Sequence, residues 1–206
     1  MSNSRIGYDL IIEEIPRCSR VLDLGCGDGT LLAELQERRE VDGYGVEIST
    51  EGVSKCLEKG LYCFQGDIDD GLSDYKDNSF DYVIINQTLQ DVKRPEFVLD
   101  EIMRICLNTI VSFPNLGCII NRVQLMFCGR MPKNRLLPFY WYESPNIHLL
   151  SIDDFSFFCR KKRYPIKNQA HFNLLDNGRV NVIKFFPNLF AEFGFFVLDG
   201  RSFVSS

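Results

Sequence analysis

Short apolar runs alternate with segments of helical spacing through the first half of the chain. This pattern predicts βαβ units around a parallel sheet, because a strand buried on both faces reads as a continuous apolar run, whereas a covering helix repeats at about 3.6 residues. The predicted fold class is α/β, with a doubly wound sheet. The predicted strands are residues 20–24, 43–47, 62–65, 80–86 and 109–113, and the predicted helices are residues 29–39, 50–59 and 95–106.

The helix predicted at residues 95–106 has a clear start and a clear apolar face. Pro95 suits its first turn, because the missing N–H would have no intrahelical partner there. Apolar side chains at helical spacing should cover the sheet. They are Val98, Leu99, Ile102, Met103 and Cys106.

The second half of the chain contains one more predicted helix and two more strands. Ser151 followed by Asp154 is typical of a helix start, the basic residues 160–163 suit the negative end of a helix dipole, and Pro165 stops the helix. The strands are residues 166–172 and 193–198, which brings the predicted total to seven.

Residues 114–150 differ from the rest of the chain, because aromatic and proline residues interrupt any regular period. We interpret this segment as a long functional insertion over the site. No repeat, low-complexity tract or linker divides the chain, so residues 1–206 are expected to form one domain.

Composition narrows the classes of partner. The chain has 206 residues, 45% of them apolar, and a net charge of -5, which gives no general attraction to nucleic acid or to an anionic membrane. The basic run at residues 160–163 coincides with a helix end and does not change this. No apolar run approaches the roughly 20 residues of a membrane span, and the first residues lack the order of a secretory signal, so a cytoplasmic protein with a small-molecule or protein partner is expected.

Eight cysteines are scattered through the sequence without a C-x-x-C pair, and only two histidines accompany them. This spacing predicts reduced thiols that mostly pack as small core residues, and no metal site. They are Cys18, Cys26, Cys56, Cys63, Cys106, Cys118, Cys128 and Cys159.

A glycine-rich loop joins the first predicted strand directly to a helix, in the run Val21-Leu22-Asp23-Leu24-Gly25-Cys26-Gly27-Asp28-Gly29-Thr30. Glycines allow a sharp turn and close approach of a ligand, and the helix N-terminus attracts a carboxylate or a phosphate. Asp23 would repel a dinucleotide pyrophosphate, and Thr30 stands where a dinucleotide motif needs a small residue. The loop therefore favours an amino-acid-like ligand that carries an ammonium group.

Acidic residues also end the next two predicted strands. Glu47 follows the loop by about 20 residues, where a carboxylate can accept hydrogen bonds from both hydroxyls of a ribose. Asp67 ends the third strand and can accept from an adenine amine. Acids at three consecutive strand tips form a stronger pattern than glycines alone, although a packing turn with helix-capping surface acids is the simpler alternative.

Together, the run from Val21 to Gly29, Glu47 and Asp67 resembles the cofactor motifs of class I S-adenosylmethionine-dependent methyltransferases. The resemblance implies a Rossmann-like fold with a mostly parallel seven-stranded sheet and an antiparallel C-terminal strand. S-adenosylmethionine or S-adenosylhomocysteine would be the ligand. The resemblance implies that Asp23, Gly25 and Gly27 face the methionyl part, Glu47 the ribose and Asp67 the adenine, with Asn86 and Gln87 beside the sulfonium. The other residues of the implied pocket are Cys26, Gly29, Ile48, Gly66 and Ile68.

A closer resemblance covers nearly the whole chain. The motifs at residues 112–115 (SFPN), 129–132 (GRMP) and 141–148 (WYESPNIH) look like those of the methionine biosynthesis protein MetW family. This resemblance implies a homoserine O-acyltransferase partner and an accessory or regulatory role in methionine synthesis. The alternative is a methyltransferase that acts on a small molecule, and the absence of an N-P-P-Y motif after the fourth strand disfavours nucleobase and glutamine acceptors.

The insertion offers candidates for catalysis and substrate binding. His148 is a candidate general base, assisted by Tyr142 or Asp91, against the alternative of a histidine held in a packed loop. Trp141 and Tyr142 can form an aromatic wall for a substrate or a sulfonium, or simply fill a core. Arg130 can hold an acceptor carboxylate, or lie solvated in a loop.

Overall fold

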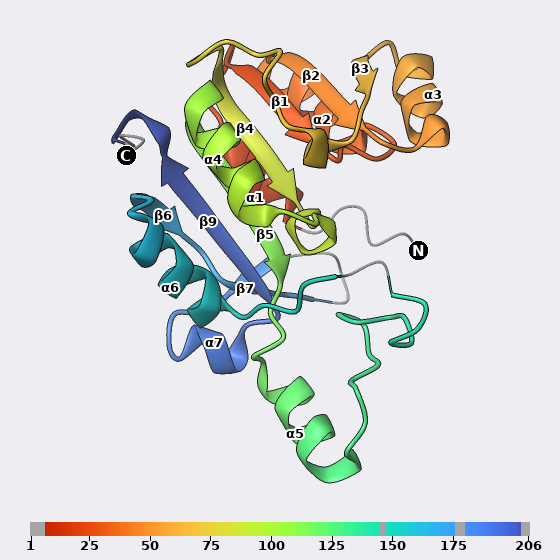
Figure 1. The fold of residues 1–206 in the computed structure, drawn as a ribbon, viewed down its shortest axis with the longest axis vertical. Coiled ribbons are helices and arrows are strands. Elements are labelled where there is room, and N and C mark those ends of the chain that lie inside the picture. The colour runs from red at the N-terminus through yellow and green to blue at the C-terminus, as the bar shows by residue number, and fades with distance from the viewer. Residues whose placement is uncertain (1–6, 145–146, 176–179, 203–206) are drawn as a thin grey trace.

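The computed structural model, which describes residues 7–144, 147–175 and 180–202, is organised around one mixed sheet (Figure 1). Its parallel part has the order β3 (Tyr62–Gln65), β2 (Asp42–Glu47), β1 (Arg20–Leu24), β4 (Phe80–Asn86) and β5 (Cys106–Pro114). β9 (Phe193–Asp199) pairs antiparallel with β5. The predicted α/β class, with its antiparallel C-terminal strand, is confirmed.

Among the residues that the structure describes, the sheet contains nine strands rather than the predicted seven. The strand expected at residues 166–172 is divided into β6 (Ile166–Gln169) and β7 (Phe172–Leu174), both of which pair with β9. β8 (Val180–Val182) then pairs with β7. β8 has only three residues and lies in an asparagine-rich segment, which is too short an apolar pattern to predict a strand. Only its pairing with β7 shows that it is one.

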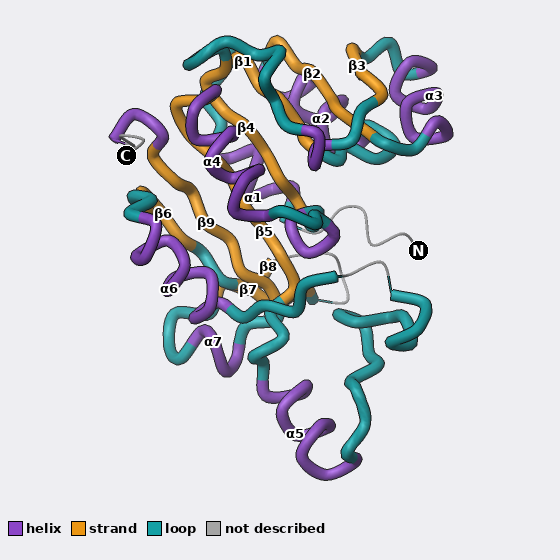
Figure 2. The backbone as a smooth tube through the Cα atoms, viewed as in Figure 1, coloured by secondary structure: helices purple, strands orange, loops and turns teal. Residues whose placement is uncertain are grey.

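Helices cover both faces of the sheet, as the tube in Figure 2 shows. α1 (Tyr8–Glu14) and α2 (Thr30–Arg39) pack on one face, where they meet Val21. α4 (Pro95–Ile105) and α6 (Ile152–Lys162) pack on the other, where they meet Leu22. Successive side chains of β1 thus enter different cores, which explains why the strands read as continuous apolar runs.

The ends of the predicted helices agree closely with the structure. Pro95 stands in the first turn of α4, and Ser151 caps α6 through a reciprocal pair of hydrogen bonds with Asp154. The predicted apolar face of α4 is buried. Cys106 was predicted to end this helix but is instead the first residue of β5. α3 (Thr50–Glu58) lies beside β3 at the edge of the sheet (Figure 1).

Three further helices did not emerge from the sequence pattern: α1, α7 (Pro187–Phe190) and α5 (Ile119–Cys128). α5 lies inside the segment expected to lack a regular period, and it projects away from the sheet (Figure 1). It ends at Gly129, whose φ of 59° is the left-handed conformation that closes many helices. Across the described residues, no helix combines the length and the apolar character needed to cross a membrane.

Candidate cofactor site

Two adjoining cavities lie at the carboxyl ends of β1, β2 and β4. The first, called the Glu47 cavity, measures about 390 Å³, and the second, called the Asp23 cavity, about 400 Å³. Gly25, Asn86 and Gln87 line both of them. The remaining lining of the Glu47 cavity is Val46, Glu47, Ile48, Gly66, Asp67, Ile68, Asp69, Thr88, Asp91, Val92 and Lys93, and that of the Asp23 cavity is Tyr8, Asp23, Cys26, Gly27, Asp28, Leu31 and Lys55.

The glycine loop turns tightly between these cavities. The backbone N–H groups of Gly25 and Cys26 both donate to the carbonyl of Val46, at 2.8 and 3.2 Å, which fixes the loop to β2. Gly25 has a φ of 74°, and a Cβ added there would lie 2.6 Å from the side chain of Thr88. Only glycine fits this position, because any larger residue would be both strained and in collision with Thr88.

Glu47 is held by two backbone donors. Its Oε2 accepts from the N–H of Gly27 at 2.9 Å, and its Oε1 accepts from the N–H of Ser49 at 2.8 Å. The residue is only 9% exposed. Because an ionised carboxylate has about four acceptor positions, each oxygen of Glu47 retains capacity for one further hydrogen bond from a group in the cavity.

Asp23 is almost completely buried, at 2% exposure, and lies near the carboxyl end of β1, just before the loop. Burial, and then the charge of Glu47, raise the pKa of its carboxyl to about 7. A buried acid beside a second acid is poorly stabilised as an anion. A cationic group in the Asp23 cavity would restore the ionised form, so this position selects for positive charge.

Asp67 shapes the other end of the Glu47 cavity. Its Oδ1 accepts from the N–H of Asp69 at 2.9 Å and thereby caps the short 3-10 helix η2 (Ile68–Asp70). The Nζ of Lys93 lies 3.8 Å from its Oδ2. Asp67 is therefore oriented by the backbone that follows β3, with Gly66 and Ile68 on either side of it in the lining.

The tip of β4 forms the boundary at which the cavities meet. The side-chain oxygen of Asn86 accepts from the hydroxyl of Ser112 on β5. Gln87 adopts a φ of 56°, unusual for a residue with a side chain, and its N–H donates to the carbonyl of Ser112 at 2.9 Å. This strained tip is held by hydrogen bonds across the sheet, so Asn86 and Gln87 present fixed polar groups to both cavities.

The structure brings together every predicted cofactor residue except Gly29. Gly29 lines neither cavity; it precedes α2 with a φ of 73° and approaches Leu61 and Cys56 so closely that a Cβ would lie 2.5 Å from Leu61. Its role is to let α2 and α3 pack together. Among the lining residues that the motifs did not indicate, Asp91 stands out, because its Oδ1 is buried with no hydrogen-bond partner in the part of the chain that the structure describes, and burial raises the pKa of its carboxyl.

The candidates from the insertion lie elsewhere. His148 lines a third cavity, of about 700 Å³, between α4 and α6, and the 3-10 helix η3 (Leu89–Asp91) separates it from the Glu47 cavity. Its backbone N–H donates to the carbonyl of Gln90 at 2.9 Å, and its Nε2 is buried without a partner in the described part of the chain. Arg130, Trp141 and Tyr142 are exposed and line neither cofactor cavity.

Comparison with known sequences shows which proteins the chain is similar to. The family model described as "Methionine biosynthesis protein MetW" matches residues 5–198. A curated relative from Rhodopirellula baltica, named bifunctional methionine biosynthesis protein MetXA/MetW, is 37% identical over 158 residues, which covers 72% of this chain and 25% of the relative. The chain thus spans about a quarter of the length of that relative.

Solved structures share the fold at low sequence identity. An S-adenosylmethionine-dependent methyltransferase from Thermotoga maritima is similar with a TM-score of 0.67 and 18% identity, over 96% of this chain and 90% of that one. One from Archaeoglobus fulgidus has a TM-score of 0.67 and 14% identity, over 95% and 92% of the two chains. These likenesses establish the Rossmann-like methyltransferase fold.

Proposed function

Because this chain belongs to the methionine biosynthesis protein MetW family, we propose that it binds S-adenosylmethionine and acts with a homoserine O-acyltransferase in methionine biosynthesis. The observation that carries the ligand is the pairing of two buried acids, Asp23 and Glu47, at the tips of neighbouring strands beside adjoining cavities. A nucleoside joined to a cationic amino acid requires this arrangement of acceptors and negative charge.

The Glu47 cavity fits the adenosine part of the ligand. The two oxygens of Glu47 are oriented by backbone donors and each can still accept from a ribose hydroxyl. Asp67 lies on the β3 side of the same cavity, where it can accept from the adenine amine. Ile48, Gly66 and Ile68 add apolar and backbone surface for a flat base.

The Asp23 cavity fits the methionyl part. The carboxylate of Asp23 would pair with the α-ammonium group, and the loop before α2 would face the α-carboxylate. Asn86 and Gln87 lie where the two halves of the ligand would join, and hence beside the sulfonium. Bound S-adenosylmethionine supplies an activated methyl group; the chain's residues supply position and charge.

The partner is supported by the relative from R. baltica, in which MetXA and MetW are joined in one named bifunctional protein, and by α5. This helix has only Asn121 buried among its residues, and its apolar side chains face outward, with Phe127 76% exposed. Exposed apolar surface of this kind marks protein interfaces. The members of this α5 surface are Ile119, Ile120, Val123, Leu125, Met126 and Phe127.

Calorimetric titration with S-adenosylmethionine, and separately with S-adenosylhomocysteine, tests the ligand. We expect saturable binding of one ligand per chain at micromolar strength, about −8 kcal/mol. Failure of both ligands to bind would overturn the ligand proposal. The partner is tested independently, by size-exclusion chromatography of this chain mixed with the homoserine O-acyltransferase from the same organism, with the acyltransferase activity measured in its presence and absence.

Methyl transfer to a small molecule is the second candidate function. It is favoured by Asp91, which lines the Glu47 cavity and carries a buried carboxyl oxygen with no hydrogen-bond partner among the described residues; its carboxylate could take a proton from an acceptor. Conversion of S-adenosylmethionine to S-adenosylhomocysteine that depends on an added metabolite, and that Asp91→Asn abolishes, would establish this function. No turnover with any metabolite of the pathway would leave binding and regulation as the role.

A further inference from the structure

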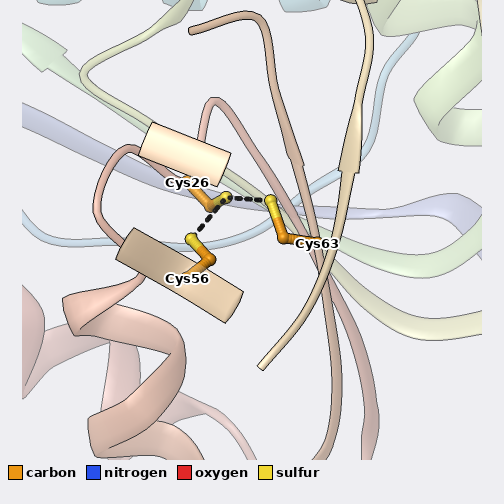
Figure 3. Close-up of side chains that lie close together, drawn as sticks. All are labelled: Cys26, Cys56 and Cys63. Atoms are coloured by element: carbon orange, nitrogen blue, oxygen red, sulfur yellow. Dashed lines mark hydrogen bonds between the residues drawn. The ribbon is translucent and has the colours of Figure 1, made fainter. Parts of the chain in front are cut away.

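Three cysteines from three different elements converge beside the glycine loop (Figure 3). Cys26 belongs to the glycine loop, Cys56 to α3 and Cys63 to β3. The Sγ of Cys26 lies 3.8 Å from that of Cys56 and 3.6 Å from that of Cys63, and all three sulfur atoms lie within 4.8 Å of one another. In Figure 3 the three side chains point toward a common centre.

These separations are those of ligands around a metal. Thiolates held at about 2.3 Å from one ion stand about 4 Å apart, whether the ion has three or four ligands. We propose that Cys26, Cys56 and Cys63 form a binding site for a thiophilic d¹⁰ metal ion, Cu⁺ or Zn²⁺. The sequence predicted no metal site, because the ligands come from three separate elements and no C-x-x-C spacing indicates them.

The donor set selects soft ions. Thiolates bind Cu⁺ and Zn²⁺ well, whereas Mg²⁺ and Ca²⁺ prefer oxygen ligands. In the described part of the chain, no histidine or carboxylate completes the group of three. A three-thiolate site suits Cu⁺, and Zn²⁺ would need a fourth ligand such as water.

Two glycines make room for the sulfur atoms. A Cβ at Gly45 on β2 would lie 2.6 Å from the Sγ of Cys26, and a Cβ at Gly29 would lie 2.8 Å from the Sγ of Cys56. A side chain at either glycine would therefore collide with a sulfur atom of the cluster. Leu32 and Leu61 enclose the same cluster with apolar surface, which limits the access of water.

An ion can reach the site from two sides. Cys63 is half-buried on β3, the edge strand of the sheet, and its neighbours Tyr62 and Phe64 are exposed. Cys26 lines the Asp23 cavity. Bound metal would tie the glycine loop to α3 and β3, next to the backbone that holds Glu47.

Metal binding must displace protons. A thiol ligates an ion as its thiolate, so each ligand must give up its proton on binding. The ion must therefore replace thiol protons, and its apparent affinity should increase with pH. Cysteines that pack only as small apolar residues would show no such stoichiometric, pH-dependent binding.

The test uses the full chain with the exposed thiols of Cys18 and Cys128 replaced by serine, so that stray binding is removed. The reduced, metal-free protein is titrated anaerobically with Cu⁺, and separately with Zn²⁺, each against a chromophoric competing chelator. We expect one ion per chain, and X-ray absorption should count three sulfur ligands. The ion that the protein withdraws more effectively from its chelator is the ion that the site prefers.

The matched variant adds Cys63→Ser to the same background, because Cys63 is the most accessible of the three and its replacement should leave the fold intact. We expect the affinity to fall by more than about 100-fold, since loss of even an outer-shell partner costs 10- to 100-fold. An unchanged thermal unfolding midpoint in the absence of metal confirms folding. Equal affinity in the two proteins, or no stoichiometric binding of either ion, would overturn the proposal.

Discussion

The carboxylate of Glu47 accepts a hydrogen bond of 2.9 Å from the backbone N–H of Gly27. This contact joins the tip of β2 to the glycine loop after β1, so a residue suited to hold a ribose also holds the loop suited to face an amino acid. Binding of either half of the ligand should therefore depend on Glu47. A substitution of Glu47 should change both the stability of the loop and the affinity for the ligand.

Glu47→Gln should weaken the binding of S-adenosylmethionine between about tenfold and about 100-fold, since hydrogen bonds to a charged group are worth about 1.5–3 kcal/mol. The glutamine side chain has the same size, but its NH₂ group replaces one carboxylate oxygen. This donor would face a backbone N–H that is itself a donor. Calorimetric titration measures the effect. Glu37→Gln on α2 is the control, because Glu37 is exposed and lines neither cavity; a similar loss there would show that charge alone is responsible.

A second prediction compares two glycines in the same backbone conformation. Gly27 and Gly60 have φ angles of 58° and 75°, and an added Cβ meets nothing within 4 Å at either position. Both alanine variants should lose about 1 kcal/mol of stability from the left-handed backbone. Only Gly27 lines the Asp23 cavity, so Gly27→Ala should weaken ligand binding while Gly60→Ala leaves it unchanged. Equal affinities in the two variants would place the ligand elsewhere.

Asp23 predicts a dependence of stability on pH. Its carboxyl titrates at about 7 in the folded chain, compared with 3.8 ordinarily, because it is buried and lies near Glu47. Between these values the folded state holds the extra proton, so this group lowers the free energy of unfolding as the pH rises from about 4 to about 7, and adds no further change above that.

Asp23→Asn should therefore stabilise the ligand-free protein at pH 8 relative to the wild type, on the order of 1–4 kcal/mol, and much less at pH 5. Urea unfolding at the two pH values measures this difference. The same variant should bind S-adenosylmethionine more weakly at pH 8, because the ammonium group loses its counter-charge. An Asn variant that is less stable than the wild type at both pH values would contradict the account of Asp23.

The fold, and the clustering of most predicted ligand residues around two cavities, could be predicted from the sequence because their determinants are local. Apolar runs define β1 to β5, and parallel strands bring Asp23, Glu47 and Asp67 to one edge of the sheet. Gly29 was assigned to the ligand by its place in the motif, whereas its close contacts with Leu61 and Cys56 arise from the packing of α2 against α3, which no local pattern encodes.

Features that depend on distant contacts could not be predicted in this way. The pairing of β7 with β8 requires two short segments to meet, and the convergence of the three cysteines requires α3 and β3 to lie beside the glycine loop. His148 was expected near the cofactor because it lies in the insertion interpreted as covering the site, but its backbone N–H donates to the carbonyl of Gln90 in η3, and the residue lines the cavity between α4 and α6.

The position of His148 predicts that it does not influence cofactor affinity. His148→Gln should bind S-adenosylmethionine as tightly as the wild type, because the side chain borders the cavity between α4 and α6 and neither cofactor cavity. Calorimetry compares the two proteins. A tenfold or larger loss of affinity would mean that η3 transmits the change to Asp91, which lies on its other side.

The α5 surface gives the last prediction, for the acyltransferase partner. Replacing Met126 and Phe127 by serine should weaken the complex by more than about tenfold, since these side chains are 70% and 76% exposed and their burial by a partner would contribute about 1.5–3 kcal/mol each. Phe157→Ser is the control: Phe157 is 61% exposed, but it lies on α6, which packs on the sheet, and not on the projecting helix α5. Surface plasmon resonance with the immobilised homoserine O-acyltransferase measures both variants, and cofactor titration verifies that each is folded. If the α6 variant loses binding and the α5 variant does not, the partner docks on the helical layer over the sheet, and α5 serves another purpose.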